Sequence, residues 1–117
     1  MQNFKDFDPS TGLTRKDIGL VYSRQPVQVV FQKEPNSKAI VNMQADCGCS
    51  KPIDQGDILI INYVPGDVPE GAVMAWNAQS EATRTPRPSH MVEKGVTITF
   101  FDQTSERIFF KAVVSMP

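Results

Sequence analysis

The chain has 117 residues, of which 40% are hydrophobic and 21% are charged, and its formal net charge is −1. This length suffices for one hydrophobic core, and the composition excludes the classes of disordered and fibrous chains. The weak net charge gives no positive field to attract a polyanion, and no apolar run reaches the roughly 18 residues of a membrane-spanning helix. We therefore expect neither a nucleic-acid partner nor insertion into a membrane.

Residues 1–17 show neither the period of a strand nor that of a helix, so we predict an irregular N-terminal arm followed by one domain over residues 18–117. Phe4 and Phe7 are apolar rings on this otherwise polar arm. Each ring can be buried either on its own domain or on a neighbouring subunit. Full burial would contribute about 1.5–3 kcal/mol to the stability of the fold or of the contact. The first residues lack the basic start and apolar stretch of a secretory signal, so export by that route is not expected.

From residue 18 onward, short β-rich runs alternate with turn residues. In the run 27–33, Val29 and Phe31 share one face while Gln28 and Gln32 share the other, as in a half-buried strand. The same reasoning predicts strands at residues 18–22, 27–33, 38–44, 57–64, 72–78, 96–102 and 107–114. The last two should form a hairpin closed over residues 103–106. This pattern predicts an all-β fold, an immunoglobulin-like β-sandwich of about seven antiparallel strands, with Trp76 in its core.

Residues 79–92 are polar and contain two prolines, so we predict a long loop. Arg84, Arg87 and His90 make this loop the most basic stretch of the chain. Long loops in small domains often carry binding residues. The loop is therefore either a solvated connection or a surface for a partner.

Both cysteines lie within Asp46-Cys47-Gly48-Cys49-Ser50-Lys51-Pro52. Residues two apart in a strand are about 6.6 Å apart, near the upper limit for a disulfide, so we expect a reduced pair that packs as small apolar side chains. A zinc site needs three or four protein ligands, and Cys47, Cys49 and His90 are only weak candidates for metal ligands. The sequence also lacks a nucleophile elbow and a glycine-rich phosphate loop. We expect no enzyme activity, no cofactor and no small-molecule substrate.

The cysteine segment resembles that of a bacterial immunoglobulin-like domain family of unknown function, related to PapD-like and ASPM/SPD-2/Hydin-like sandwiches. The resemblance spans about residues 21–114 and includes Gly56-Asp57-Ile58, Ile60-Ile61-Asn62-Tyr63 and Phe109-Phe110-Lys111-Ala112-Val113-Val114. The family usually has Thr where this chain has Ser50, and its members generally carry export signals. The resemblance implies an immunoglobulin-like fold and a non-catalytic role.

Immunoglobulin-like domains without an export signal resemble the accessory proteins of tailed bacteriophages, and the crAss-like phages infect hosts rich in this family. This resemblance implies a non-catalytic virion structural protein, an auxiliary capsid or tail decoration module located in the virion. It would contact other virion subunits through Phe4, Phe7, Arg84 and Arg87. One alternative is a cell-envelope interaction or chaperone-like module, in the periplasm or at the cell surface if a leader was removed. The other is a thiol- or metal-binding protein using the Cys-Gly-Cys segment.

Overall fold

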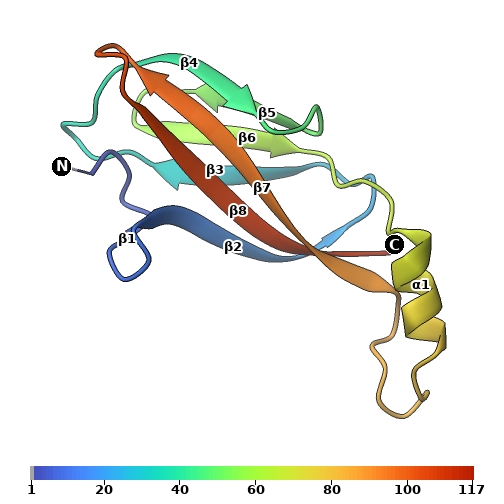
Figure 1. Ribbon diagram of the computed structural model, residues 1–117. Coiled ribbons are helices and arrows are strands. Elements are labelled where there is room, and N and C mark those ends of the chain that lie inside the picture. Colours follow the sequence, from blue (N-terminus) through green and yellow to red (C-terminus); the bar gives the residue numbers. More distant parts are fainter. Residues whose placement is uncertain (1) are drawn as a thin grey trace.

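The computed structural model describes residues 2–117 and contains two β-sheets that face one another, with one short helix at an end (Figure 1). One sheet has five strands in the order β1-β2-β8-β7-β4, and the other has three in the order β3-β6-β5. The elements are β1 (Phe7–Asp8), β2 (Leu13–Tyr22), β3 (Val27–Gln32), β4 (Ile40–Ala45), β5 (Ser50–Asp54), β6 (Ile58–Tyr63), α1 (Glu70–Asn77), β7 (Ser89–Phe100) and β8 (Ser105–Ser115). This confirms the expected mostly β, two-sheet architecture.

The core lies between the sheets and is built from alternate residues of the strands, because successive side chains point to opposite faces. Its members on the strands are nearly inaccessible to water, and they come from both sheets: Val29, Phe31, Leu59, Ile61, Tyr63, Val96, Ile98, Phe100, Ile108, Phe110 and Val114. The rings of Tyr63 and Phe110 meet edge to face across the core, with centroids 4.9 Å apart. The residues on the inner face of one sheet thus cover those of the other.

Most predicted strands agree with the structure. The hairpin of β7 and β8 is antiparallel, and residues 101–104 form its tip. Strand β2, however, runs parallel to β8, so the strands are not all antiparallel. Strand β5 was not predicted because it contains Pro52, a residue that only an edge strand accommodates.

The prediction of a strand over residues 72–78 is wrong, because α1 occupies Glu70–Asn77. Ala72, Val73 and Trp76 are its partly covered residues, and this spacing fits one face of a helix. Trp76 therefore does not lie in the core between the sheets. The predicted loop is also shorter, since β7 already begins at Ser89. No helix in residues 2–117 is long and apolar enough to span a bilayer.

Residues 2–17 are integrated into the domain, which corrects the expectation of an irregular arm. They contain β1 and the first half of β2. Phe4 is 1% exposed, and its ring meets that of Phe31 edge to face. The N–H of Lys5 donates to the carbonyl of Gln32 at 2.8 Å. The Phe4 ring therefore packs on its own domain, which is the first of the two alternatives given above.

Candidate protein-contact surface

The outer face of the five-stranded sheet carries a row of apolar side chains. Leu20 on β2 lies opposite Val113 on β8, and Val113 lies opposite Met91 on β7. Leu20 is 57% exposed and Met91 is 62% exposed. Neighbouring exposed apolar side chains on one sheet face are typical of protein interaction sites. We call these three residues the apolar row.

A groove of about 570 Å³ adjoins this row. It is lined by Leu20, Tyr22 and Val113 of the sheet and by Pro86, Arg87 and Pro117 outside the strands. Arg87 is exposed, and among residues 2–117 no carboxylate lies within ion-pair distance of it. The groove therefore has a mixed lining of apolar and neutral polar side chains, with Arg87 as a positive charge that has no carboxylate partner within residues 2–117.

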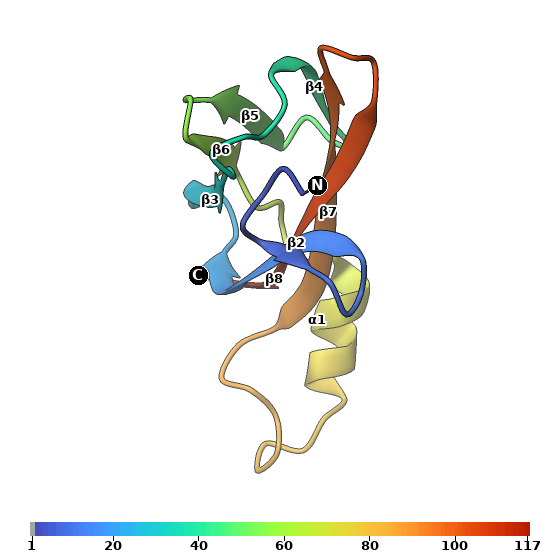
Figure 2. The ribbon, with the colours of Figure 1, turned by 90° about the vertical axis from the view of Figure 1, so that its left-hand side faces the viewer.

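The loop that contributes to the groove lining is held by a few contacts with α1. The indole Nε1 of Trp76 donates to the carbonyl of Thr85 at 2.8 Å, and the guanidinium of Arg84 lies 4.0 Å from the indole ring centroid. Arg84 also pairs with Glu81 at 3.7 Å. Figure 2 shows α1 and this loop projecting beyond the two sheets. Of the two predicted contact arginines, Arg84 contacts Trp76 and Glu81, and Arg87 has no carboxylate partner within the described residues 2–117.

The tip of the β7–β8 hairpin lies at the other end of the molecule (Figure 1). Phe101 at this tip is 65% exposed, the highest value among the exposed large hydrophobic side chains of residues 2–117. Its N–H donates to the carbonyl of Ala39 at 2.9 Å, which fixes the backbone under the ring. The tip therefore presents an aromatic side chain on an ordered turn.

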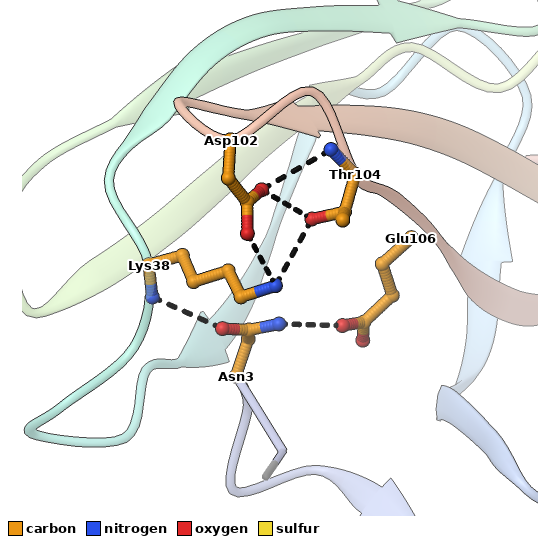
Figure 3. A network of polar contacts seen from close by, with 5 residues as sticks. All are labelled: Asn3, Lys38, Asp102, Thr104 and Glu106. Atoms are coloured by element: carbon orange, nitrogen blue, oxygen red, sulfur yellow. Dashed lines mark hydrogen bonds and ion pairs between the residues drawn. The ribbon is translucent and has the colours of Figure 1, made fainter.

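A network of polar contacts orders the tip (Figure 3). Asp102 accepts hydrogen bonds from the hydroxyl and the N–H of Thr104 and pairs with the Lys38 ammonium at 2.8 Å. The hydrogen bond from Lys38, and then that from the Thr104 hydroxyl, lowers the pKa of Asp102 from 3.8 to about 2. Asn3 joins the network by accepting from the Lys38 N–H and donating to Glu106. The N-terminal segment thus braces the hairpin tip.

Cys47 and Cys49 form a disulfide in the turn between β4 and β5, which corrects the expectation of a reduced pair. Their Cα atoms are 5.3 Å apart, because the chain turns at Gly48 instead of continuing as a strand. The Ser50 hydroxyl lies 3.7 Å from the Cys49 sulfur. Two of the three weak metal candidates are therefore bonded to each other.

Cys49 and His90 line a common hollow of about 260 Å³. The Nδ1 atom of His90 is buried and has no hydrogen-bond partner within residues 2–117. The same residues contain no group of three or more His, Cys, Asp or Glu side chains placed to hold a metal ion. The structure thus brings His90 and Cys49 to one hollow but does not add the further ligands that a metal centre needs.

The remaining predicted contact residues differ in position. Phe4 is part of the core and Phe7 is partly covered on β1. The sequence reasoning did not identify Leu20, Met91, Val113 or Phe101 as a surface. A signal was present for Leu20, which alternates with the buried Val21, and for Val113, which lies between the inward-facing Ala112 and Val114.

No protein-family model matches this sequence, and no curated protein matches it either.

Proposed function

We propose that the chain is a non-catalytic immunoglobulin-like module that acts by protein–protein contact, as an auxiliary subunit of a virion capsid or tail. The observation that carries the contact role is the apolar row of Leu20, Met91 and Val113 beside the groove. Two facing sheets, with β2 parallel to the last strand, support the immunoglobulin-like assignment. The virion setting rests on the resemblance to immunoglobulin-like accessory proteins of tailed phages.

Burial of the apolar row would supply the driving force for such a contact. A standard interface covers about 800 Å² on each partner, and a few central side chains carry most of its energy. The row lies on three hydrogen-bonded strands, so little backbone order has to be gained on binding. Exposed apolar side chains on fixed strands suit a protein-contact surface better than a catalytic site.

The test compares two single substitutions in a tagged chain produced in the host cells during virus production. Leu20→Glu places a charge in the groove lining, and Val41→Glu places the same charge on β4, where Val41 is 63% exposed. Particles are purified on a density gradient, and the chain in them is quantified against the major capsid protein. We expect Leu20→Glu to lower incorporation at least about tenfold, as a loss of roughly 1.4 kcal/mol implies. Val41→Glu should leave it unchanged.

Equal incorporation of both variants would contradict the proposed surface. Absence of the wild-type chain from purified particles would contradict the virion role itself.

A second candidate function is favoured by one observation. The Cys47–Cys49 disulfide suits an oxidising compartment, such as the periplasm or a cell surface, where disulfides persist. This supports the cell-envelope interaction module as the alternative. Fractionation separates the two roles, because an envelope module would be found with the periplasm or cell surface and not with particles.

A further inference from the structure

We infer that the Cys47–Cys49 disulfide is a thiol-exchange site, which oxidises a partner dithiol and is itself reduced. Cys47 receives the attacking thiolate, and Cys49 is the sulfur that leaves. The inference uses neither the apolar row nor the groove, so it holds or fails independently of the proposed contact function. It is carried by the position of the disulfide, by the backbone around it and by the side chains next to Cys49.

The disulfide closes a very short loop at the surface. The two cysteines are two residues apart and partly exposed, and Gly48 between them is exposed. Apart from its chain neighbours, Gly48 has no heavy atom within 4 Å of the place that a Cβ atom would take, so the space beside the turn is open. The chain-entropy stabilisation by a disulfide decreases with the length of the loop, so this bond stabilises less than a bridge between distant segments. These properties suit reaction with an external thiol better than a structural role.

The backbone of the turn is held by hydrogen bonds that do not depend on the sulfur–sulfur bond. The Asp46 N–H donates to the carbonyl of Gly95 on β7 at 3.0 Å, and the Val64 N–H donates to the carbonyl of Cys49 at 2.9 Å. The Asp46 carboxylate also pairs with the Arg107 guanidinium at 2.6 Å. The turn is therefore tied to both sheets when the disulfide is open, and the two thiols stay close enough to form the bond again.

A buried hydroxyl contacts both sulfur atoms. Ser50 is 5% exposed, and its Oγ atom lies 3.9 Å from the sulfur of Cys47 and 3.7 Å from that of Cys49. Within residues 2–117 these two sulfurs are the hydrogen-bond partners of the Ser50 hydroxyl. A hydrogen bond to a charged acceptor is stronger than one to a neutral acceptor. The hydroxyl is thus placed to stabilise the thiolate that forms when the disulfide opens.

The surroundings of Cys49 favour it as the leaving sulfur. Cys49 lines the hollow of about 260 Å³ together with Lys94, whereas Cys47 does not line it. Within residues 2–117 no carboxylate lies at ion-pair distance from the Lys94 ammonium, and Asp67 in the same hollow pairs with Arg24. A nearby cation stabilises a thiolate, and a more stable thiolate leaves faster. Attack is therefore directed to Cys47.

The exchange runs in two steps. First, one partner thiolate attacks the Cys47 sulfur, the Cys47–Cys49 bond breaks with its electron pair on Cys49, and a mixed disulfide joins the partner to Cys47. Second, the other partner thiolate attacks the partner's sulfur in the mixed disulfide, and Cys47 leaves as a thiolate. The partner loses two electrons and becomes a disulfide, and the chain gains them and becomes a dithiol. The two protons released by the partner thiols are taken up by the two cysteines.

A dithiol is the expected partner because Cys49 stays next to Cys47 after the first step. A partner with one thiol forms an adduct on Cys47 that Cys49 can displace, which only reverses the reaction. A second thiol on the partner completes the transfer instead. Each chain converts one dithiol and then stops, so the reaction is stoichiometric and agrees with a non-catalytic module.

Two thiol probes test the exchange on the whole folded chain. Reduced glutathione is added to the oxidised chain, the reaction is quenched early with N-ethylmaleimide, and tandem mass spectrometry locates both groups. We expect glutathione on Cys47 and the maleimide on Cys49. Dithiothreitol, which has two thiols, should give the reduced chain and one equivalent of oxidised dithiothreitol. Circular dichroism should show the same fold before and after reduction.

Substitutions test the assigned roles. Lys94→Gln removes the cation of the hollow, and Ser50→Ala removes the hydroxyl between the sulfurs. Lys111→Gln is the matched control, because Lys111 lies on β8 between two inward-facing residues and therefore points to the outer face. We expect Lys94→Gln and Ser50→Ala each to slow the reaction with glutathione at least about threefold, and Lys111→Gln to leave the rate unchanged. Lys94→Arg and Ser50→Thr should keep most of the rate.

Three results would overturn the inference: a disulfide that stays oxidised in a glutathione buffer, as structural disulfides do, glutathione on Cys49 as often as on Cys47, or a chain that unfolds on reduction. The last result would make the bond a structural bridge. Unchanged rates in both Lys94→Gln and Ser50→Ala would overturn the assigned direction of attack. None of these results affects incorporation of Leu20→Glu into particles, so failure of the exchange site is distinguished from failure of the proposed contact surface.

Discussion

The hairpin end and the helix end of the molecule differ in what fixes them. At the hairpin end, Asn3, Lys38 and Asp102 connect the N-terminal segment and the tip by charged and neutral hydrogen bonds, next to the buried Phe4. At the helix end, α1 has no buried residue, and the loop after it depends on Trp76 and Arg84. The hairpin end is thus an extension of the core, while the helix end is a separate small cluster.

The largest expected effect comes from Phe4→Ala, which removes the link between the N-terminal segment and the core. A fully buried phenylalanine replaced by alanine typically costs about 3–5 kcal/mol, through lost burial and the cavity that remains. Urea unfolding measures the loss. Phe7→Ala is the control, since Phe7 is only partly covered and should cost clearly less. A Phe4→Ala variant as stable as Phe7→Ala would show that the N-terminal segment does not brace this end.

The helix end should respond to Trp76→Ala locally. The substitution removes the indole hydrogen bond to Thr85 and the stacking of Arg84, together about 1–2 kcal/mol. Hydrogen exchange should become faster in residues 70–88 while the strands of the core keep their protection. Trp76→Phe keeps an aromatic face for Arg84 without the donor and should give a smaller change. Uniformly faster exchange over the whole chain would instead make the helix end part of the core.

The sequence predicted those parts of the fold in which alternation is strong. The runs around Val29 and Phe31, and the hairpin from Val96 to Val114, have their inward-facing residues as predicted. Strand β2 was predicted over only its last five residues, because its first half places Thr14 toward the interior and Leu13 toward solvent. The alternation of apolar and polar residues is reversed there, so no strand period is visible.

The helix and the groove could not be predicted for different physical reasons. The apolar residues of 72–78 fit a strand as well as a single helical face, and a run this short does not distinguish them. The groove is assembled from β2, β8, the loop before β7 and the C-terminus, which are distant in the sequence. Phe4 is buried and Phe7 is partly covered, and only the tertiary structure decides what covers each ring.

The smallest expected effect is on the pH dependence of stability, and it is measured at one carboxylate from each end of the molecule. Asp102 at the hairpin tip and Asp67 between β6 and α1 are both surface carboxylates whose pKa is lowered, by Lys38 and Arg24 respectively. A carboxylate whose pKa is lower in the folded state than in the unfolded state stabilises the fold. Its full contribution is present above the pKa of the unfolded state, which is near 4. That contribution is lost as the pH falls, for Asp102 through about pH 2.

Unfolding at pH 7 and at pH 2 measures the difference for the wild type, Asp102→Asn and Asp67→Asn. Both variants should lose less stability between these pH values than the wild type, because the group that takes up the proton is gone. The reduction should be larger for Asp102→Asn, since Asp102 has both Lys38 and Thr104 as partners while Asp67 has Arg24 alone. A larger effect of Asp67→Asn would reverse the comparison and make the helix end the one that polar contacts fix.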